Sequence, residues 1–244
     1  MALMLKKLLA IGMLAIATNA TAGLTTIEFN DGDSLAGWNT DRSTPSGFEI
    51  INDELVLSID GADSPNPQGV FYDTQGMQLQ FGEYVNYLSI DMFIDSDNWL
   101  DGFRYAGIWG IGRNSANPSN VAGWPILEYQ GAGAVVPANP AGVATWDNLG
   151  WGADVSTLFN ANAYNNLKLW VTSGSGVQYF LNDTLIYTDT SGDVDYLSGV
   201  ILNARNYGTS YDVKFDNLTF GAVPEPGLFV LFAFGALMVF RRHR

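Results

Sequence analysis

Residues 178–187 are Gln-Tyr-Phe-Leu-Asn-Asp-Thr-Leu-Ile-Tyr, and this stretch decides the fold. Two runs of aromatic, leucine and β-branched residues flank the pair Asn182-Asp183, and such runs favour β-strands. Asn and Asp tolerate positive φ, which a two-residue hairpin turn requires. The stretch therefore predicts a β-hairpin that turns at Asn182-Asp183.

Segments of the same kind recur at short spacing along the chain, and Gly, Asn, Asp, Pro and Ser fill nearly every gap. No long stretch has helical periodicity, although 160–166 could form a helical turn and 132–144 a glycine-rich loop. One all-β domain, a sandwich or a barrel, is the expected fold class. We expect strands at 25–29, 48–51, 54–59, 70–72, 84–94, 105–111, 126–129, 167–172, 178–181, 184–187, 197–203 and 211–220.

Three segments sharpen this expectation: 29–38 (FNDGDSLAGW), 167–171 (LKLWV), which leads into the hairpin, and 213–218 (VKFDNL). Their arrangement resembles the concanavalin-like jelly roll of laminin-G-type and glucanase-type domains. The resemblance implies a two-sheet antiparallel β-sandwich over 23–220, with the hairpin at a sheet edge and the first and last strands paired.

The N-terminus has the pattern of a secretory signal. Lys6 and Lys7 precede an apolar run over 8–17, and Ala20-Thr21-Ala22 forms a small-x-small cleavage site. The apolar run is too short to span a bilayer. We expect export and cleavage after Ala22, so that 1–22 is a signal peptide.

The C-terminus combines a proline-rich linker at 221–227, an apolar run over 228–240 and a basic end. The run has 13 residues, fewer than the roughly 20 that cross a bilayer comfortably, and the cationic end belongs on the cytoplasmic side. A transmembrane tail at 228–244 is therefore expected, and a permanent anchor is one interpretation of it.

The other interpretation comes from a second resemblance. Pro224-Glu225-Pro226, the adjoining apolar helix and the terminal Arg241, Arg242 and Arg244 resemble the PEP-CTERM sorting signal. This resemblance implies an exosortase as partner, removal or transfer of the tail, and a mature protein at the cell surface or in an exopolysaccharide matrix.

Composition excludes several classes of function. Residues 23–220 hold six of the 11 Lys and Arg residues against 24 of the 25 acids, a formal charge of −18. Such a charge argues against nucleic acid as a partner. Cysteine is absent and the single histidine, His243, lies in the basic end, so the domain has no thiol chemistry, no imidazole zinc site and no Ser-His-Asp triad.

A glucanase of the resembling fold delivers its carboxylates as Glu-x-Asp-x-x-Glu along one strand, and no glutamate of this chain has Asp two residues later. Catalytic residues are therefore not carried over. A glycoside hydrolase or polysaccharide lyase with other groups stays open, with Asp95, Asp97, Asp101 and Glu128 as its loosely grouped candidates.

Structural calcium is a possible cofactor. Asp95, Asp97 and Asp101 are spaced oxygen ligands near Gly102, although the twelve-residue calcium loop is absent and an acidic solvated turn is the alternative. Asp216 corresponds, in the resembling glucanases, to an aspartate near the last strand that helps to bind a structural calcium. Backbone carbonyls near the first strand and Gly47 would complete that site.

Five of the seven tryptophans lie between 99 and 151. Aromatic faces stack on sugar rings while polar groups bond the hydroxyls, so these residues predict a glycan-binding surface on a concave sheet, with core packing as the alternative for each. A non-catalytic, lectin-like protein that binds secreted polysaccharide is the leading hypothesis, and a purely structural matrix protein is another. The expected glycan-binding residues are Trp99, Arg104, Tyr105, Trp109, Trp124, Trp146 and Trp151.

Overall fold

The computed structural model describes residues 23–63, 74–99, 104–131, 141–152, 158–172 and 176–224. Residues Thr25–Gly221 form one compact unit. A second unit combines Met1–Leu24 with Ala222–Arg244, and only 23–24 and 222–224 of it are described. Two predicted segments lie outside the described residues: the signal peptide at 1–22 and the tail from Glu225 to the basic end. Within the described residues, no helix is long and apolar enough to span a membrane.

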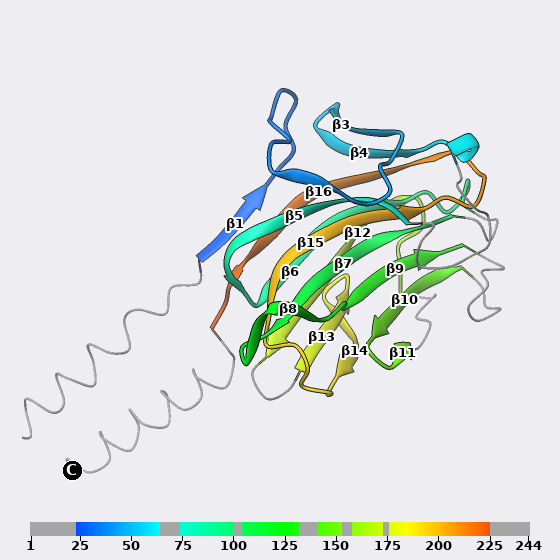
Figure 1. Ribbon diagram of the computed structural model, residues 1–244. Coiled ribbons are helices and arrows are strands. Elements are labelled where there is room, and N and C mark those ends of the chain that lie inside the picture. Colours follow the sequence, from blue (N-terminus) through cyan, green and yellow to red (C-terminus); the bar gives the residue numbers. More distant parts are fainter. Residues whose placement is uncertain are drawn as a thin grey trace, which may run out of the picture. The chain divides into compact units, whose positions relative to one another are not determined.

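Two antiparallel sheets make up the sandwich (Figure 1). Sheet A has the order β14-β13-β12-β6-β16-β4-β3, and β1 pairs with β16. Its strands are β1 (Gly23–Ile27), β3 (Gly47–Ile51), β4 (Glu54–Ile59), β6 (Tyr87–Ile94), β12 (Ala163–Thr172), β13 (Gly176–Leu181), β14 (Thr184–Asp189) and β16 (Tyr211–Ala222).

Sheet B has the order β11-β10-β9-β7-β15-β5-β2, and β8 pairs with β7. The predicted two-sheet antiparallel sandwich is confirmed. The strands of sheet B are β2 (Trp38–Arg42), β5 (Thr74–Val85), β7 (Tyr105–Asn114), β8 (Asn117–Gly123), β9 (Ile126–Gln130), β10 (Gly142–Asp147), β11 (Gly150–Trp151) and β15 (Tyr196–Arg205). Within the described ranges the one helical element is a 3₁₀ turn, η1 (Gly61–Asp63).

The core lies between the sheets and follows the two-residue period of the strands. Along β16, Tyr211, Val213 and Phe215 are buried while Asp212 and Lys214 between them are exposed. The inward side chains of both sheets form one continuous hydrophobic cluster. Strand β16 thus keeps these two charged side chains on the face of sheet A that is turned away from sheet B.

The hairpin that decides the fold is confirmed. Leu181 pairs with Thr184, and the turn residues Asn182 and Asp183 have φ of 49° and 63°. Strand β14 is the edge of sheet A, as the resemblance implied. The predicted pairing of the first and last strands is confirmed by β1 and β16.

Three local predictions are wrong. The expected single strand at 84–94 is two strands, because the chain passes at Asn86 from β5 in sheet B to β6 in sheet A, where the Asn86 N–H donates to the Gly221 carbonyl. The expected helical turn at 160–166 is a turn followed by β12, because the buried Asn165 amide bonds the backbone of Asn160 and Ala163. Residues 142–144 of the expected loop belong to β10, and 132–140 lie outside the described residues.

Candidate functional site

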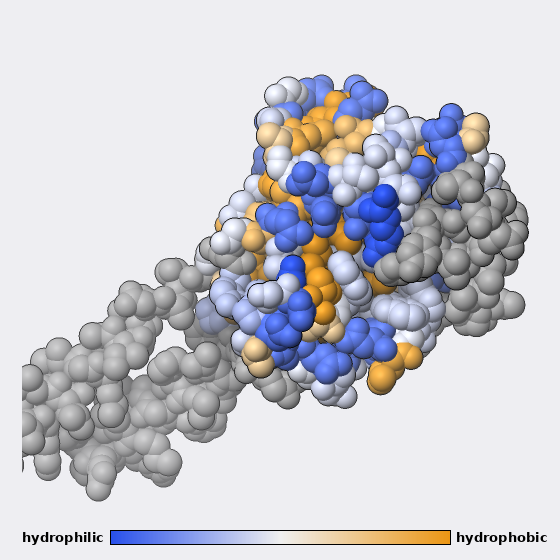
Figure 2. All heavy atoms as spheres, viewed as in Figure 1, coloured by the Kyte–Doolittle hydropathy of each residue, from blue (hydrophilic) through white to orange (hydrophobic). Residues whose placement is uncertain are grey.

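The face of sheet B that is turned away from the core carries a second, smaller hydrophobic cluster. Its buried members are Trp109, Ile111, Ile126 and Ile201, and Trp124, Trp146 and Trp151 pack against them half-buried. On this side of the molecule, orange hydrophobic residues lie between blue hydrophilic ones over β5, β15 and β7 (Figure 2). We call this surface the aromatic face.

Strand register places five of the seven cluster residues in one row across the sheet. Ile201 pairs with Trp109, Trp109 with Ile126, Ile126 with Trp146, and Trp146 with Trp151. Four steps between strands of about 4.8 Å give the row a length of roughly 19 Å. The aromatic face therefore runs perpendicular to the strands.

Arg42 covers part of this row because its backbone is left-handed, with φ of 57°. Its guanidinium carbon lies 4.4 Å from the Trp109 ring centroid and 5.7 Å from that of Trp124, which is cation–π geometry. Asp41 forms an ion pair with Arg42. Trp109 is only 1% exposed, so it supports the surface, and Trp124, Trp146 and Trp151 supply the accessible aromatic area.

A buried polar cluster forms the adjacent row. The Glu128 carboxylate, 0% exposed, lies 2.9 Å from the Arg205 guanidinium and accepts a 3.3 Å hydrogen bond from the Asn203 amide. Gly107 lies between Glu128 and Asn203 in register. A Cβ on Gly107 would come within 2.0 Å of the Leu127 carbonyl oxygen, so glycine is required there.

This cluster supports the aromatic face from one side. The Arg205 guanidinium carbon lies 4.9 Å from the Tyr105 ring centroid and 5.4 Å from that of Trp151. Burial by itself would lower the pKa of Arg205, but the Glu128 carboxylate, together with Tyr207 and Tyr105, outweighs burial and the net pKa is raised. Arg205 therefore keeps its charge beneath Trp151.

The two carboxylates on this face are poorly arranged for glycoside hydrolysis. Asp41, Gly76, Asn203, Gly107 and Glu128 follow one another in register. Asp41 and Glu128 are thus four strands apart, roughly 19 Å, whereas paired glycosidase carboxylates stand about 5–9.5 Å apart. Each of the two is also held in an ion pair.

The other candidate carboxylates lie elsewhere. Asp95 follows β6 in sheet A, where both of its oxygens accept hydrogen bonds from the Asn98 amide, and Asp97 is exposed in the same turn. Asp101 lies outside the described residues. The structure therefore does not bring Asp95 or Asp97 together with Glu128.

Two of the expected glycan-binding residues, Trp99 and Arg104, lie away from the accessible tryptophans, and a third, Tyr105, is buried and reaches Trp151 only through Arg205. Trp99 is 2% exposed and packs in the main core against Tyr129 and Tyr211. Tyr105 is buried beside Arg205, and Arg104 lies near Tyr211 at a separate pocket. The other four, Trp109, Trp124, Trp146 and Trp151, do gather on the aromatic face.

The expected calcium ligands do not converge in the described chain. Gly47 pairs with Ser58, and Ser58 in turn pairs with Asp212 of β16. Asp216 is four residues farther along β16, so it does not lie opposite Gly47. Asp216 lies opposite Asp91, and burial followed by repulsion from Asp91 raises its pKa. Among the described residues no group of three or more acidic or metal-binding side chains could hold one ion, and calcium stays a prediction.

Sequence reasoning missed Arg42, Asn203 and Arg205. Arg42 reaches the aromatic face only through its left-handed backbone, for which the sequence carries no signal. The sequence does carry a signal for Asn203 and Arg205. Both belong to β15 and alternate with the core residues Leu202 and Ala204, which places their side chains on the face of sheet B that is turned away from the core.

The sequence matches no protein-family model and no curated protein. Solved structures, however, share the fold. The chain folds as a concanavalin-like jelly roll. Bacillus licheniformis β-glucanase has a TM-score of 0.54 at 12% identity, with 84% of this chain and 100% of that chain covered.

Two further structures are similar. One comes from work on the endo-acting O-glycanases that prominent members of the human gut microbiota express to initiate mucin breakdown. Its TM-score is 0.58 at 10% identity, and 82% of this chain and 99% of that chain are covered. The other is the GlcNAcα1-4Gal-releasing endo-β-galactosidase from Clostridium perfringens, with a TM-score of 0.54 at 14% identity over 83% and 63%. The jelly roll thus provides the frame on which the aromatic face is built.

Proposed function

We propose that the protein is a non-catalytic, lectin-like module that binds an extended polysaccharide along the aromatic face. The observation that carries the proposal is the row from Trp109 through Trp146 to Trp151, which spans the four strands β7, β9, β10 and β11, together with Trp124 and Arg42. Accessible indoles offer stacking surfaces to sugar rings, and the guanidinium and neighbouring carboxylate offer hydrogen bonds to hydroxyls. The jelly-roll neighbours named for glycan-acting enzymes support this class of ligand.

Binding is favoured over hydrolysis by the state of the carboxylates. Glu128 is fully buried under Arg205, and Asp41 is paired with Arg42. A general acid must reach the glycosidic oxygen, and a second carboxylate, the nucleophile or the base, must stand about 5–9.5 Å from the first. Neither described carboxylate of this face meets both requirements.

The same proposal includes the cellular location of the protein. Export by the signal at 1–22 and recognition of Pro224-Glu225-Pro226 and the arginine end by an exosortase would place the mature module at the cell surface or in a polysaccharide matrix. Insertion of one epitope before Pro224 and another after Arg244 tests the processing. Both epitopes on one envelope species would leave a permanent anchor in place of sorting.

Binding is tested with the full-length chain by affinity electrophoresis in gels that contain neutral or acidic polysaccharides. Trp146→Ala and Trp151→Ala should each weaken binding about tenfold, since a truncated anchor residue costs more than about 1 kcal/mol and 1.4 kcal/mol is a factor of ten. Trp170→Ala is the matched control, because this half-buried tryptophan lies on sheet A.

The alternatives give different results in the same material. Release of reducing sugar, or of an unsaturated product, would identify a hydrolase or a lyase in place of a lectin. A purely structural matrix protein would bind no polysaccharide and release no product, while its deletion would still impair the matrix.

A further inference from the structure

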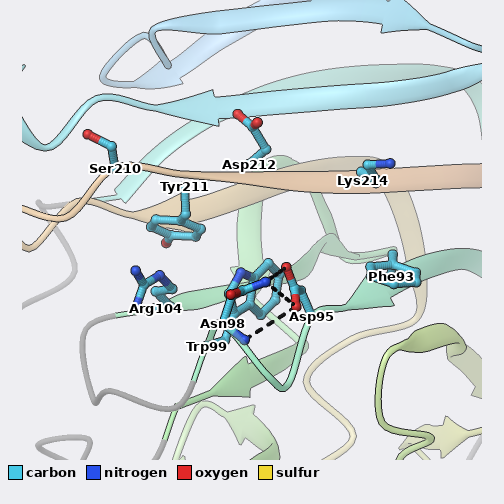
Figure 3. A pocket seen from close by; sticks show the side chains of 9 residues that line it. All are labelled: Phe93, Asp95, Asn98, Trp99, Arg104, Ser210, Tyr211, Asp212 and Lys214. Atoms are coloured by element: carbon cyan, nitrogen blue, oxygen red, sulfur yellow. Dashed lines mark hydrogen bonds between the residues drawn. The ribbon is translucent and has the colours of Figure 1, made fainter.

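A pocket of about 370 Å³ lies on the other sheet, between the end of β6 and the start of β16 (Figure 3). Phe93 and the exposed Asp212 and Lys214 point away from sheet B, since Met92 and Val213 beside them are in the core. In Figure 3, Asp212 projects from β16 on the side opposite to Asp95, Asn98 and Arg104, and Lys214 lies farther along the strand. We call this the β6–β16 pocket.

The pocket combines both signs of charge. Lys214 is 2.7 Å from the Glu54 carboxylate, and the Arg104 guanidinium carbon is 6.0 Å from the Tyr211 ring centroid. Asp95 is engaged by the Asn98 amide, whereas the exposed Asp212 carboxylate accepts no hydrogen bond from a described residue. Two cations and two carboxylates in the lining cancel, which suits a neutral ligand that both donates and accepts hydrogen bonds.

An aromatic wall completes the pocket. Phe93 is half-buried, and its ring is held edge-to-face by Tyr164 at 5.5 Å between centroids and 71° between planes. The apolar face of a sugar ring can stack on such a ring, while its hydroxyls donate to Asp212 and accept from Lys214 and Arg104. A volume of 370 Å³ is near the lower end of the roughly 300–1,000 Å³ of small-ligand pockets, so the ligand is short.

We propose that the β6–β16 pocket is a second saccharide site, which takes a neutral unit of one or two sugar rings. Because it opens on sheet A and the aromatic face lies on the outer side of sheet B, one molecule would hold two separate chains. This cross-linking rests on the proposed function of the aromatic face, whereas saccharide binding in the pocket does not.

The test of the pocket uses the full-length chain and three neutral disaccharides: cellobiose, maltose and lactose. Saturation-transfer NMR and calorimetry should detect at least one of them in millimolar or tighter association. Phe93→Ala and Asp212→Asn should each weaken that binding at least tenfold. Glu49→Gln, which neutralises an exposed carboxylate on β3, is the matched control and should leave it unchanged.

Cross-linking is measured by light scattering with soluble mixed-linkage β-glucan and with a neutral galactan. Wild type should form large assemblies that Phe93→Ala abolishes while the 1:1 association remains. Trp146→Ala with Trp151→Ala should lose the assemblies and most of the polysaccharide affinity, and should keep disaccharide binding in the pocket. Disaccharide binding that is absent, or that resists both pocket variants, would overturn the second site. Polysaccharide binding that survives those variants would leave the proposed function standing, so the two failures are distinguishable.

Discussion

The buried pair of Glu128 and Arg205 gives a sharp quantitative prediction about the support of the aromatic face. Glu128→Gln keeps the shape of the side chain but removes the charge, which leaves the Arg205 guanidinium, 10% exposed, without its counter-ion. Loss of one partner of a buried pair costs about 3–5 kcal/mol. Since domains are stable by about 5–15 kcal/mol, the denaturation midpoint in urea should fall by roughly a fifth or more.

A double-mutant cycle isolates the pair. Arg205→Met should cost a similar amount, because it leaves a carboxylate unpaired, and the double variant should cost less than the sum by about 2–3 kcal/mol. Urea unfolding followed by tryptophan fluorescence measures all four corners. The exposed pair of Glu54 and Lys214 serves as control, and its disruption should cost about 0–1 kcal/mol.

The outcome can also contradict the reasoning. If Glu128→Gln costs less than about 1 kcal/mol and the cycle shows no coupling, then the pair does not stabilise the domain. If Glu128→Gln leaves stability unchanged but abolishes product release from a polysaccharide, Glu128 is catalytic and the lectin proposal fails.

Three further predictions follow from single residues. Burial, followed by the charge of Asp95, raises the pKa of Tyr129 to about 12, and its hydroxyl has no hydrogen-bond partner among the described residues. Because the pKa is raised by folding, the contribution of Tyr129 to the free energy of unfolding should be fully present below a pH of about 10 and should be lost as the pH rises toward about 12. Tyr129→Phe should be neutral or stabilising at neutral pH and should lessen the fall in melting temperature at high pH. Gly107→Ala should destabilise the fold by about 1–3 kcal/mol or more, measured by urea unfolding, since its Cβ would meet the Leu127 backbone, and a cost near zero would mean that β7 can shift. Calcium at Asp216 or Asp95 predicts a higher melting temperature in calcium than in chelator, and equal melting would dispose of both sites.

The predictable part of the fold is local. The Asn182-Asp183 turn follows from residue types that accept positive φ, and the observed angles agree. The passage at Asn86 was missed because no Gly or Pro marks it; the residue is fixed by backbone hydrogen bonds to Gly221 and Val171, which are far away in sequence. Strand β2 was missed because its Trp-Asn-Thr-Asp-Arg sequence is polar, as an edge strand can be.

The candidate site was predictable only as a composition. Trp99 and Trp109 belong to the same aromatic region, yet one packs in the main core and the other on the outer face of sheet B. Register decides this for Trp109, because it alternates with the core-facing Ile108 on β7. Glu128 and Arg205 are 77 positions apart, and only the order β9-β7-β15 with Gly107 between them brings their side chains together.

Strand β16 also has a mechanical role if the predicted tail holds the protein at the envelope. The tail leaves from the end of β16, which lies inside sheet A between β6 and β4 and pairs with both. Hydrogen bonds of an antiparallel ladder are perpendicular to the strand, so tension along β16 loads many of them at once in shear. A chain tethered at this strand should resist a pulling force far better than one tethered at the edge hairpin, where the bonds would open one after another.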